Sequence, residues 1–316
     1  MFDSIWDDIK SKYYSGNTLI RIIMLNIAVF LIVLFTGLIL QAVYGFGSSP
    51  YNNFLEFFMI SKNGWHNLTH PWTIISYMFL HESFWHIFWN MVVLYWFGNI
   101  VGDLMGDRVV LPTYLLSGIA GGLVYFICGY LPIPWNIGMY ALGASAAVNG
   151  FMMLAASKFP NYGVSIPFIG PVRIKYIVAI FLIIDLVSIR ENSNTGGHFA
   201  HLGGAATGWF IVYLLENHRI DLIRDVNRIL DAIAGFFSSI FAKKAGKTSA
   251  AYGKKQKQEK SRSQSFVVRK PRENTRQDTT QSDQERIDSI LDKIKISGYE
   301  NLTAEEKDFL YKASKE

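Results

Sequence analysis

Four polar residues stand in segments of this chain that are otherwise apolar, and together they could carry out a hydrolysis. They are His86, Asn90, Ser145 and His201. A serine hydroxyl is a weak nucleophile until a base removes its proton, and a neutral imidazole is the usual base. A histidine N–H, an asparagine amide and the serine's own backbone N–H can stabilise the oxyanion that forms after attack. These residue types indicate acyl transfer to Ser145 followed by hydrolysis.

Each of these residues also has an ordinary structural interpretation. A serine in a membrane helix commonly packs against a neighbour, a histidine near a helix end commonly lies at the interface, and an asparagine can hold two helices together. The combination favours a site, because His86, Ser145 and His201 each come within one or two turns of the outer start of a predicted helix. Asn90 follows His86 by four residues, so it lies on the same face and about 6 Å deeper.

The composition excludes an ordinary soluble protein. The chain has 316 residues, of which 50% are hydrophobic and 17% are charged, and its mean hydropathy is +0.20. Soluble domains carry about 25% charged residues. The apolar residues gather in six long runs that are nearly free of charge, at Leu19–Gly47, Phe84–Val101, Val109–Leu131, Met139–Ala156, Ile174–Ile189 and His198–Leu215. We therefore predict an all-α polytopic membrane protein with six transmembrane helices.

Charge is divided unevenly along the chain. Residues 1–216 hold 9 Lys and Arg against 10 Asp and Glu, whereas residues 217–316 hold 21 against 15. A basic tail after an apolar body is typical of a segment attracted to anionic lipid, and no recognition motif points to a nucleic-acid partner. If the N-terminus is cytoplasmic, the outside loops contain only two Lys or Arg residues, Lys62 and Arg190. This agrees with the excess of Lys and Arg in the cytoplasmic loops of membrane proteins. We expect a multi-pass protein of a bacterial plasma (inner) membrane, with both termini in the cytoplasm.

The pattern divides the chain into five parts. The first, a cytoplasmic N-terminal segment, shows no cleavable signal peptide, because its first apolar run starts late and is too long. A membrane domain, an amphipathic juxtamembrane helix, a disordered basic linker and a small two-helix unit follow. The predicted bounds of the five parts are 1–17, 18–216, 217–245, 246–283 and 284–316. Within the last part, Thr303 and Glu306 match a capping box.

Small residues recur at four-residue spacing in the predicted spans. Gly204 and Gly208 lie in the sixth run, and Gly143, Ala147 and Gly150 lie in the fourth. Such spacing lets helix backbones approach closely in lipid. We therefore expect the fourth and sixth helices to pack together, which would bring the serine of one to the histidine of the other.

Three motifs, placed in order on the second, fourth and sixth predicted spans, resemble the signature of the rhomboid intramembrane serine proteases. They are His81-x4-His86-x3-Asn90, Gly143-Ala144-Ser145 and Ala200-His201-Leu-Gly-Gly204-x3-Gly208. The similarity covers roughly residues 60–215. It implies a rhomboid-like bundle in which Ser145 is the nucleophile and His201 the general base, with His86 and Asn90 as oxyanion stabilisers. It also implies a membrane-protein substrate cleaved in its transmembrane helix near the outer end, with no metal or cofactor.

Two positions depart from that pattern, and one acidic residue is unexplained by it. Ala146 stands where glycine is usual, and Asn149 stands where many members place an aromatic ring against the catalytic histidine. A hydrogen bond would have to replace the ring in orienting His201. Asp185, inside the fifth run, could orient His201 or pair with a neighbouring helix. We favour the pairing, and the resemblance implies a Ser–His dyad, so Asp185 stays outside the predicted catalytic set.

Two alternative functions compete with a serine protease. Zinc could bind His81, His86, His198 and His201. A five-residue spacing, however, places His81 and His86 about 140° apart on a helix, and no acidic ligand is evident beside them. The second alternative is a protein without activity, either a rhomboid-like scaffold that holds membrane clients or a transporter. No internal repeat supports a transporter. Neither the substrate nor the oligomeric state follows from the residues.

Overall fold

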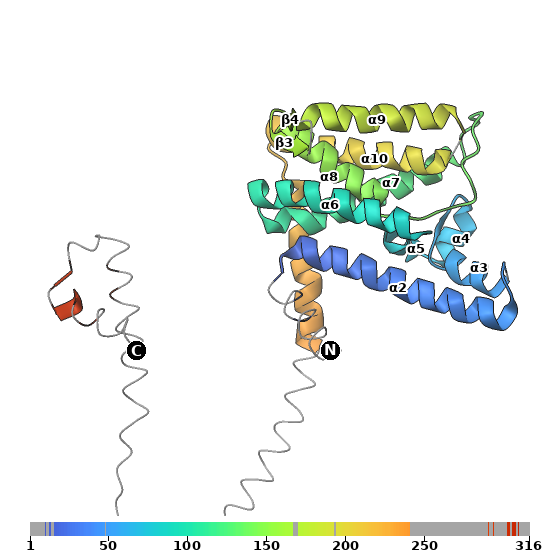
Figure 1. Cartoon of the computed structure of the whole chain (residues 1–316), viewed down its shortest axis with the longest axis horizontal. Coiled ribbons are helices and arrows are strands. Elements are labelled where there is room, and N and C mark those ends of the chain that lie inside the picture. Colours follow the sequence, from blue (N-terminus) through green and yellow to red (C-terminus); the bar gives the residue numbers. More distant parts are fainter. Residues whose placement is uncertain are drawn as a thin grey trace, which may run out of the picture. The chain divides into compact units, whose positions relative to one another are not determined.

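The computed structural model describes most of the chain up to residue 240 (Figure 1). The described residues are 10, 13, 16–47, 49–166, 170–192, 194–240, 290, 293, 302, 303, 305–307 and 309. The chain divides into two units, Met1–Phe241 and Ala242–Glu316. The predicted linker at 246–283 lies outside the described residues, as do most of the segment 1–17 and most of the two-helix unit at 284–316.

Six helices make up the body of the first unit, and each coincides with one of the predicted apolar runs. They are α2 (Thr18–Tyr44), α6 (Phe84–Met105), α7 (Val110–Cys128), α8 (Ser145–Lys158), α9 (Ile174–Arg190) and α10 (Thr195–Tyr213). Figure 1 shows α9 along one side of the bundle and α2 along the opposite side. Side chains cap the N-termini of two helices. The Asn17 side chain accepts a hydrogen bond from the Ile20 N–H, and the Ser83 side chain accepts one from the His86 N–H.

Three helices among the described residues are long and apolar enough to cross a membrane: α2, α6 and the stretch Asp107–Cys128 that contains α7. α8 has 14 residues and is therefore about 21 Å long, which is short of the roughly 30 Å hydrocarbon core. α9 has 17 residues. The chain is thus mostly helical with three candidate spans, and the count of six stays a prediction.

Helix α8 lies at the centre of the bundle. It packs against α6, α7, α9 and α10. Nearly all of its residues from Ala146 to Ala156 are buried, with Phe151 and Leu154 fully enclosed. A helix with side chains buried on every face needs neighbours all round it. Its short length is therefore compatible with a membrane, because other helices rather than lipid surround it.

Helices α8 and α10 approach each other backbone to backbone. A Cβ atom at Gly204 would collide with the carbonyl oxygen of Ala146, and one at Gly208 would collide with that of Gly150. Only residues without a side chain permit this approach. The predicted close packing of the fourth and sixth runs is confirmed.

The segment between α2 and α6 is structured. It contains α3 (Ser49–Glu56), β1 (Ile60–Ser61), α4 (Gly64–Thr69), α5 (Thr73–Ser76) and the short helix η1 (Tyr77–Phe79). Tyr77 is buried, and its hydroxyl donates to the carbonyl of Gly118 on α7 over 2.6 Å. The segment therefore packs against the bundle at the end where α6 begins.

Two short pairs of strands correct the prediction of an all-α protein. β1 pairs antiparallel with β2 (Tyr140–Ala141), and β3 (Gly163–Ile166) pairs antiparallel with β4 (Gly170–Arg173). The first pair joins the segment after α2 to the segment that leads into α8. The strands have two to four residues each, too few to show an alternating pattern in the sequence.

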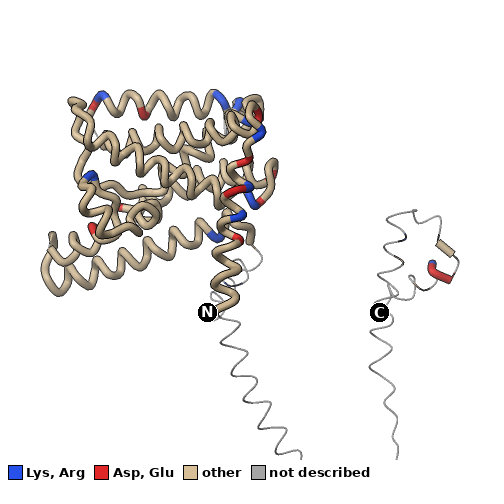
Figure 2. Tube along the Cα trace, turned by 180° about the vertical axis from the view of Figure 1, so that it is seen from behind, with Lys and Arg blue, Asp and Glu red and all other residues tan. Residues whose placement is uncertain are grey.

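Charged side chains gather at the other end of the bundle, where β3, β4 and the helical residues 222–240 lie (Figure 2). Arg108 pairs with Asp231 over 2.6 Å and Lys158 pairs with Glu216 over 2.8 Å. Residues 222–240 fall within the predicted juxtamembrane helix at 217–245. In the second unit the predicted capping box is confirmed: the Thr303 N–H donates to the Glu306 carboxylate over 2.8 Å, and the Glu306 N–H to the Thr303 hydroxyl over 3.3 Å.

The close approach of α8 and α10 makes a stability prediction. Gly204→Ala should lower the free energy of unfolding by about 1–3 kcal/mol, because the new methyl group meets backbone that cannot rotate away. Gly102→Ala is the matched control, since a Cβ at that helical glycine meets only Val110 Cγ2 at 3.6 Å. Thermal unfolding in detergent, followed by tryptophan fluorescence, measures both variants. Equal midpoints for the two variants would contradict the backbone contact.

Candidate active site

Ser145 is the first residue of α8, at a turn that only glycine adopts easily. Gly143 has φ of 126°, and its N–H donates to the carbonyl of Tyr77 over 2.9 Å. Ala144, the residue before the helix, offers no side-chain cap. The backbone N–H groups of the first turn therefore lack intrahelical acceptors, and the positive end of the helix dipole lies at the serine.

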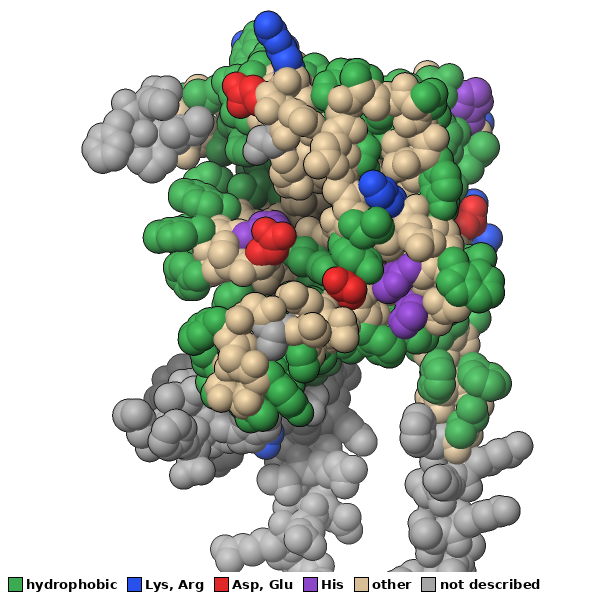
Figure 3. Space-filling model, turned by 90° about the vertical axis from the view of Figure 1, so that its right-hand side faces the viewer, with side chains coloured by type: hydrophobic (Ala, Val, Ile, Leu, Met, Phe, Trp, Pro, Cys, Tyr) green, Lys and Arg blue, Asp and Glu red, His purple; other side chains and the backbone are tan. Residues whose placement is uncertain are grey.

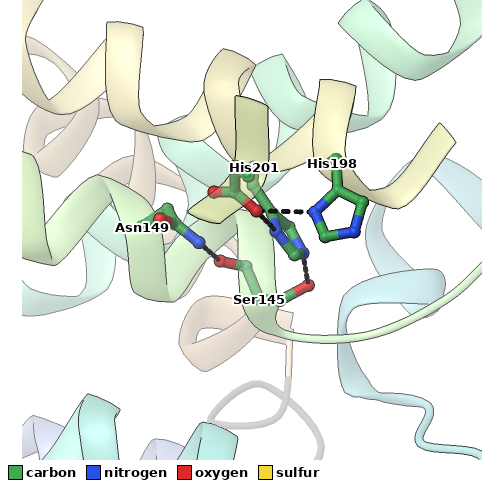
Figure 4. Close-up of polar contacts among 5 residues, drawn as sticks. Ser145, Asn149, His198 and His201 are labelled. Atoms are coloured by element: carbon green, nitrogen blue, oxygen red, sulfur yellow. Dashed lines mark hydrogen bonds and ion pairs between the residues drawn. The ribbon is translucent and has the colours of Figure 1, made fainter. Parts of the chain in front are cut away.

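Ser145 and His201 are in direct contact, although they come from different helices (Figure 4). Nε2 of His201 lies 2.7 Å from Oγ of Ser145. Nδ1 of the same ring lies 2.8 Å from Oδ1 of Asp185. Because an ionised carboxylate only accepts hydrogen bonds, Nδ1 carries the ring proton and Nε2 is free to accept from the serine hydroxyl. This tautomer suits a general base.

Asp185 links α9 to α10 through two histidines at once. The same oxygen, Oδ1, also lies 2.6 Å from Nδ1 of His198. The carboxylate side chain is 8% exposed, and the two imidazoles are 16% and 17% exposed. The favoured interpretation of Asp185 as a partner of a neighbouring helix is therefore right. One of those partners is His201, so the contact that the other interpretation requires is present as well.

Sequence reasoning left Asp185 out of the site, although two signals pointed to it. An acidic residue inside an apolar run needs a partner, because its charge is costly there. His198 and His201 are three residues apart, so both imidazoles lie on one face of their helix. Together, these signals predict a carboxylate facing two imidazoles, but the resemblance to a dyad family favoured leaving the acid aside.

Asn149 does not take over the orienting role of the missing aromatic ring. Its amide donates to the carbonyl of Ser145, one turn back on the same helix, over 3.0 Å (Figure 4). Nδ1 of His201 contacts Asp185 on α9 instead. A hydrogen bond to the imidazole is therefore present, but it does not come from Asn149.

His86 lies near the serine, and Asn90 lies one turn further along α6. A Cβ at Gly143 would lie 3.0 Å from Nε2 of His86 and 3.5 Å from Oγ of Ser145, so these groups border one small space. Asn90 is buried one turn deeper, and its amide donates to the His86 carbonyl over 2.8 Å. Among the hydrogen bonds of the described residues, neither side chain contacts Ser145.

The site also contains a group of side chains that could hold a metal ion. Asp185, His198 and His201 place one ligand atom each within 4.8 Å of one another. His81, which the zinc alternative invokes, is not in this group. It precedes α6, is buried, and meets the His86 ring edge to face at 5.0 Å. The hydrogen bonds of the group already use its three ligand atoms, and the remaining nitrogen of His201 faces the serine, so the arrangement favours proton transfer.

The site reaches the surface at the end of the bundle where α6, α8 and α10 begin. His86, Ser145 and His201 are all half-buried. Figure 3 shows this end, where histidine and acidic side chains are exposed among apolar ones. Partial exposure allows water, the second reactant of a hydrolysis, to approach the serine.

Comparison with known proteins finds one matching domain, a second matching segment and several relatives. Residues 68–218 match the rhomboid domain, and residues 275–316 match a family of unknown function, DUF6576. RHOMBOID-like protein 12, mitochondrial, of Arabidopsis thaliana is 36% identical over 147 residues, which are 42% of this chain and 43% of that protein. Rhomboid protein 1, mitochondrial, of Saccharomyces cerevisiae is 27% identical over 186 residues, 56% of this chain and 52% of that protein.

A third relative is presenilin-associated rhomboid-like protein, mitochondrial, of Mus musculus. It is 30% identical over 159 residues, which are 46% of this chain and 40% of that protein. The chain therefore spans about half or less of the length of these relatives.

The relatives also correct a prediction about location. All three are named as mitochondrial proteins, which contradicts the expectation of a bacterial plasma membrane with cytoplasmic termini. Apolar runs and the placement of Lys and Arg orient helices in a bilayer, but they do not distinguish one membrane from another. The matched domain and the relatives together support membership of this chain in the rhomboid family.

Proposed function

We propose that this chain is an intramembrane serine endopeptidase that cleaves transmembrane segments of membrane proteins near the outer face of the bilayer. The observation that carries the proposal is the 2.7 Å contact between Oγ of Ser145 and Nε2 of His201. Family membership supports it, because rhomboid proteins are generally intramembrane serine proteases that act on membrane-protein substrates.

The chemistry follows from the tautomer of His201. As Oγ of Ser145 attacks a substrate peptide carbonyl, Nε2 of His201 takes the serine proton, and a tetrahedral oxyanion forms. The imidazolium then gives that proton to the leaving amine, which leaves an ester on Ser145. A water molecule attacks the ester while His201 removes its proton, and the acid product departs with the serine restored.

Three kinds of donor are available for the oxyanion. The free N–H groups at the start of α8 are one, and the His86 and Asn90 side chains are the others. The small space bordered by Gly143, His86 and Ser145 supports this role, because a carbonyl oxygen there would face the serine and the imidazole together. Donors fixed in place before the reaction stabilise the charge that develops in the transition state.

The six helices α2, α6, α7, α8, α9 and α10 form the proposed membrane protease domain over residues 18–216. Three of them meet the length and apolarity of a span. α8 is short, but its burial by four neighbouring helices keeps its ends away from lipid. The starts of α6, α8 and α10 lie at one end of the bundle, so the site would lie just below the outer surface. A shallow site fits a reaction that consumes water.

The first prediction concerns the nucleophile and its base. Ser145→Ala and His201→Ala should each lower cleavage of a single-span membrane protein in proteoliposomes by about 10³-fold or more, since each removes a member of the attacking pair. Labelling by a fluorophosphonate should be lost in both variants. Ser117→Ala is the matched control, because its buried hydroxyl has no hydrogen-bond partner among the described residues.

The same experiment separates a protease from a catalytically silent scaffold. A scaffold would bind a membrane client equally well with or without the Ser145 hydroxyl, and it would take up no fluorophosphonate. Cleavage that persists in Ser145→Ala would end the proposal, and so would labelling that Ser117→Ala abolishes and Ser145→Ala does not.

The second prediction concerns the oxyanion donors. His86→Ala and Asn90→Ala should each lower kcat by about tens- to a thousand-fold with little change in KM, because the lost donor acts only in the transition state. Asn99→Ala is the matched control on the same helix, where the Asn99 amide donates to the Tyr95 carbonyl as Asn90 does to His86. Equal effects at Asn90 and Asn99 would show that Asn90 serves the helix alone.

A further inference from the structure

We propose that Asp185 is a positioning residue that completes a Ser145–His201–Asp185 triad in this chain. The proposal rests on the proposed function and replaces the dyad that the family resemblance implies. The three residues come from α8, α10 and α9. They form one continuous line of hydrogen bonds, with 2.7 Å from serine to imidazole and 2.8 Å from imidazole to carboxylate.

The first step of the argument is the tautomer of the base. A neutral imidazole carries one proton, on either Nδ1 or Nε2, and only the Nδ1–H form can accept the serine proton. The Asp185 carboxylate accepts at Nδ1 and so selects that form. Among the hydrogen bonds of the described residues, no other group contacts Nδ1 of His201. Asp185 is therefore the group that selects the reactive tautomer.

The second step is the charge that develops during the reaction. When His201 takes the serine proton it becomes an imidazolium, and a negative carboxylate 2.8 Å from that ring stabilises the new charge. The Asp185 side chain is only 8% exposed, so water screens this attraction weakly. A second N–H donor, from His198, bonds to the same oxygen over 2.6 Å and helps to hold the carboxylate charged and in place.

The third step distinguishes a positioning role from a purely structural role, in which Asp185 only holds α9 against α10. We call this structural role a brace. A brace would be served equally by the bond to His198 and the bond to His201. A triad needs only the bond to His201, with His198 as support for the carboxylate. Removing each histidine bond separately therefore separates the two roles.

The test uses the full chain in proteoliposomes and follows kcat, KM and fluorophosphonate labelling. Asp185→Asn keeps the size of the side chain but removes its charge, and its amide can donate to Nδ1 and so stabilise the wrong tautomer. We expect kcat to fall by about 10²–10⁴-fold while KM stays within about threefold. His198→Gln should lower kcat by less than about tenfold, because the bond between Asp185 and His201 remains. Glu191→Gln, which removes an exposed carboxylate at the end of α9, should leave kcat unchanged.

The charge of the carboxylate gives a readout that separates the two roles. Asp185→Glu keeps the charge that Asp185→Asn removes, so it should restore kcat toward the value of the unmodified chain.

The outcomes are distinct. If Asp185→Asn and His198→Gln lower the thermal midpoint and kcat to the same extent, and Asp185→Glu does not restore kcat, Asp185 is a brace and the triad is wrong. If labelling requires Ser145 and His201 but Asp185→Asn labels at the original rate, the chain uses a dyad and the proposed function stands. If the unmodified chain shows no labelling that depends on Ser145, the proposed function itself fails.

Discussion

The contact between Oγ of Ser145 and Nε2 of His201 depends on how closely two helix backbones approach. Ser145 on α8 and His201 on α10 are 56 positions apart in the sequence. Within the described residues, no other hydrogen bond joins α8 to α10. Gly204 allows α10 to pack directly against the Ala146 carbonyl, one residue after the serine. A methyl group at that glycine would push the two helices apart and so lengthen and weaken this contact.

The same approach explains why α8 can be short and central. Because α6, α7, α9 and α10 enclose it, its first turn can begin inside the protein, where unpaired N–H groups lie beside the serine instead of in lipid. Residues outside the six main helices hold the turn that precedes α8. The Gly143 N–H bonds to Tyr77, and β2 pairs with β1. The segment after α2 thus helps to position Ser145, the proposed nucleophile.

Much of this arrangement could be predicted from sequence, and the exceptions share a physical cause. Long apolar runs mark α2, α6 and α7, and small residues at four-residue spacing mark the contact between α8 and α10. The residues left open whether Asp185 contacts His201, because that contact depends on the rotation of α9 about its axis relative to α10. Packing sets that rotation, and the resemblance to a dyad family favoured leaving Asp185 outside the site. The two-residue strands were missed because so few residues show no period.

His201, the proposed base, is on α10, but the carboxylate that contacts its Nδ1 is on α9. Asn149 occupies the position of an orienting ring but bonds to its own helix, so the orientation of His201 relies on α9. Burying a carboxylate among apolar side chains is costly unless each charged oxygen finds donors. Asp185 meets two on one oxygen, and this offsets part of the cost while it fixes α9 against α10. Any displacement of α9 would carry the Asp185 carboxylate away from the ring of His201. The proposed action of His201 as a base therefore depends on contact between α9 and α10.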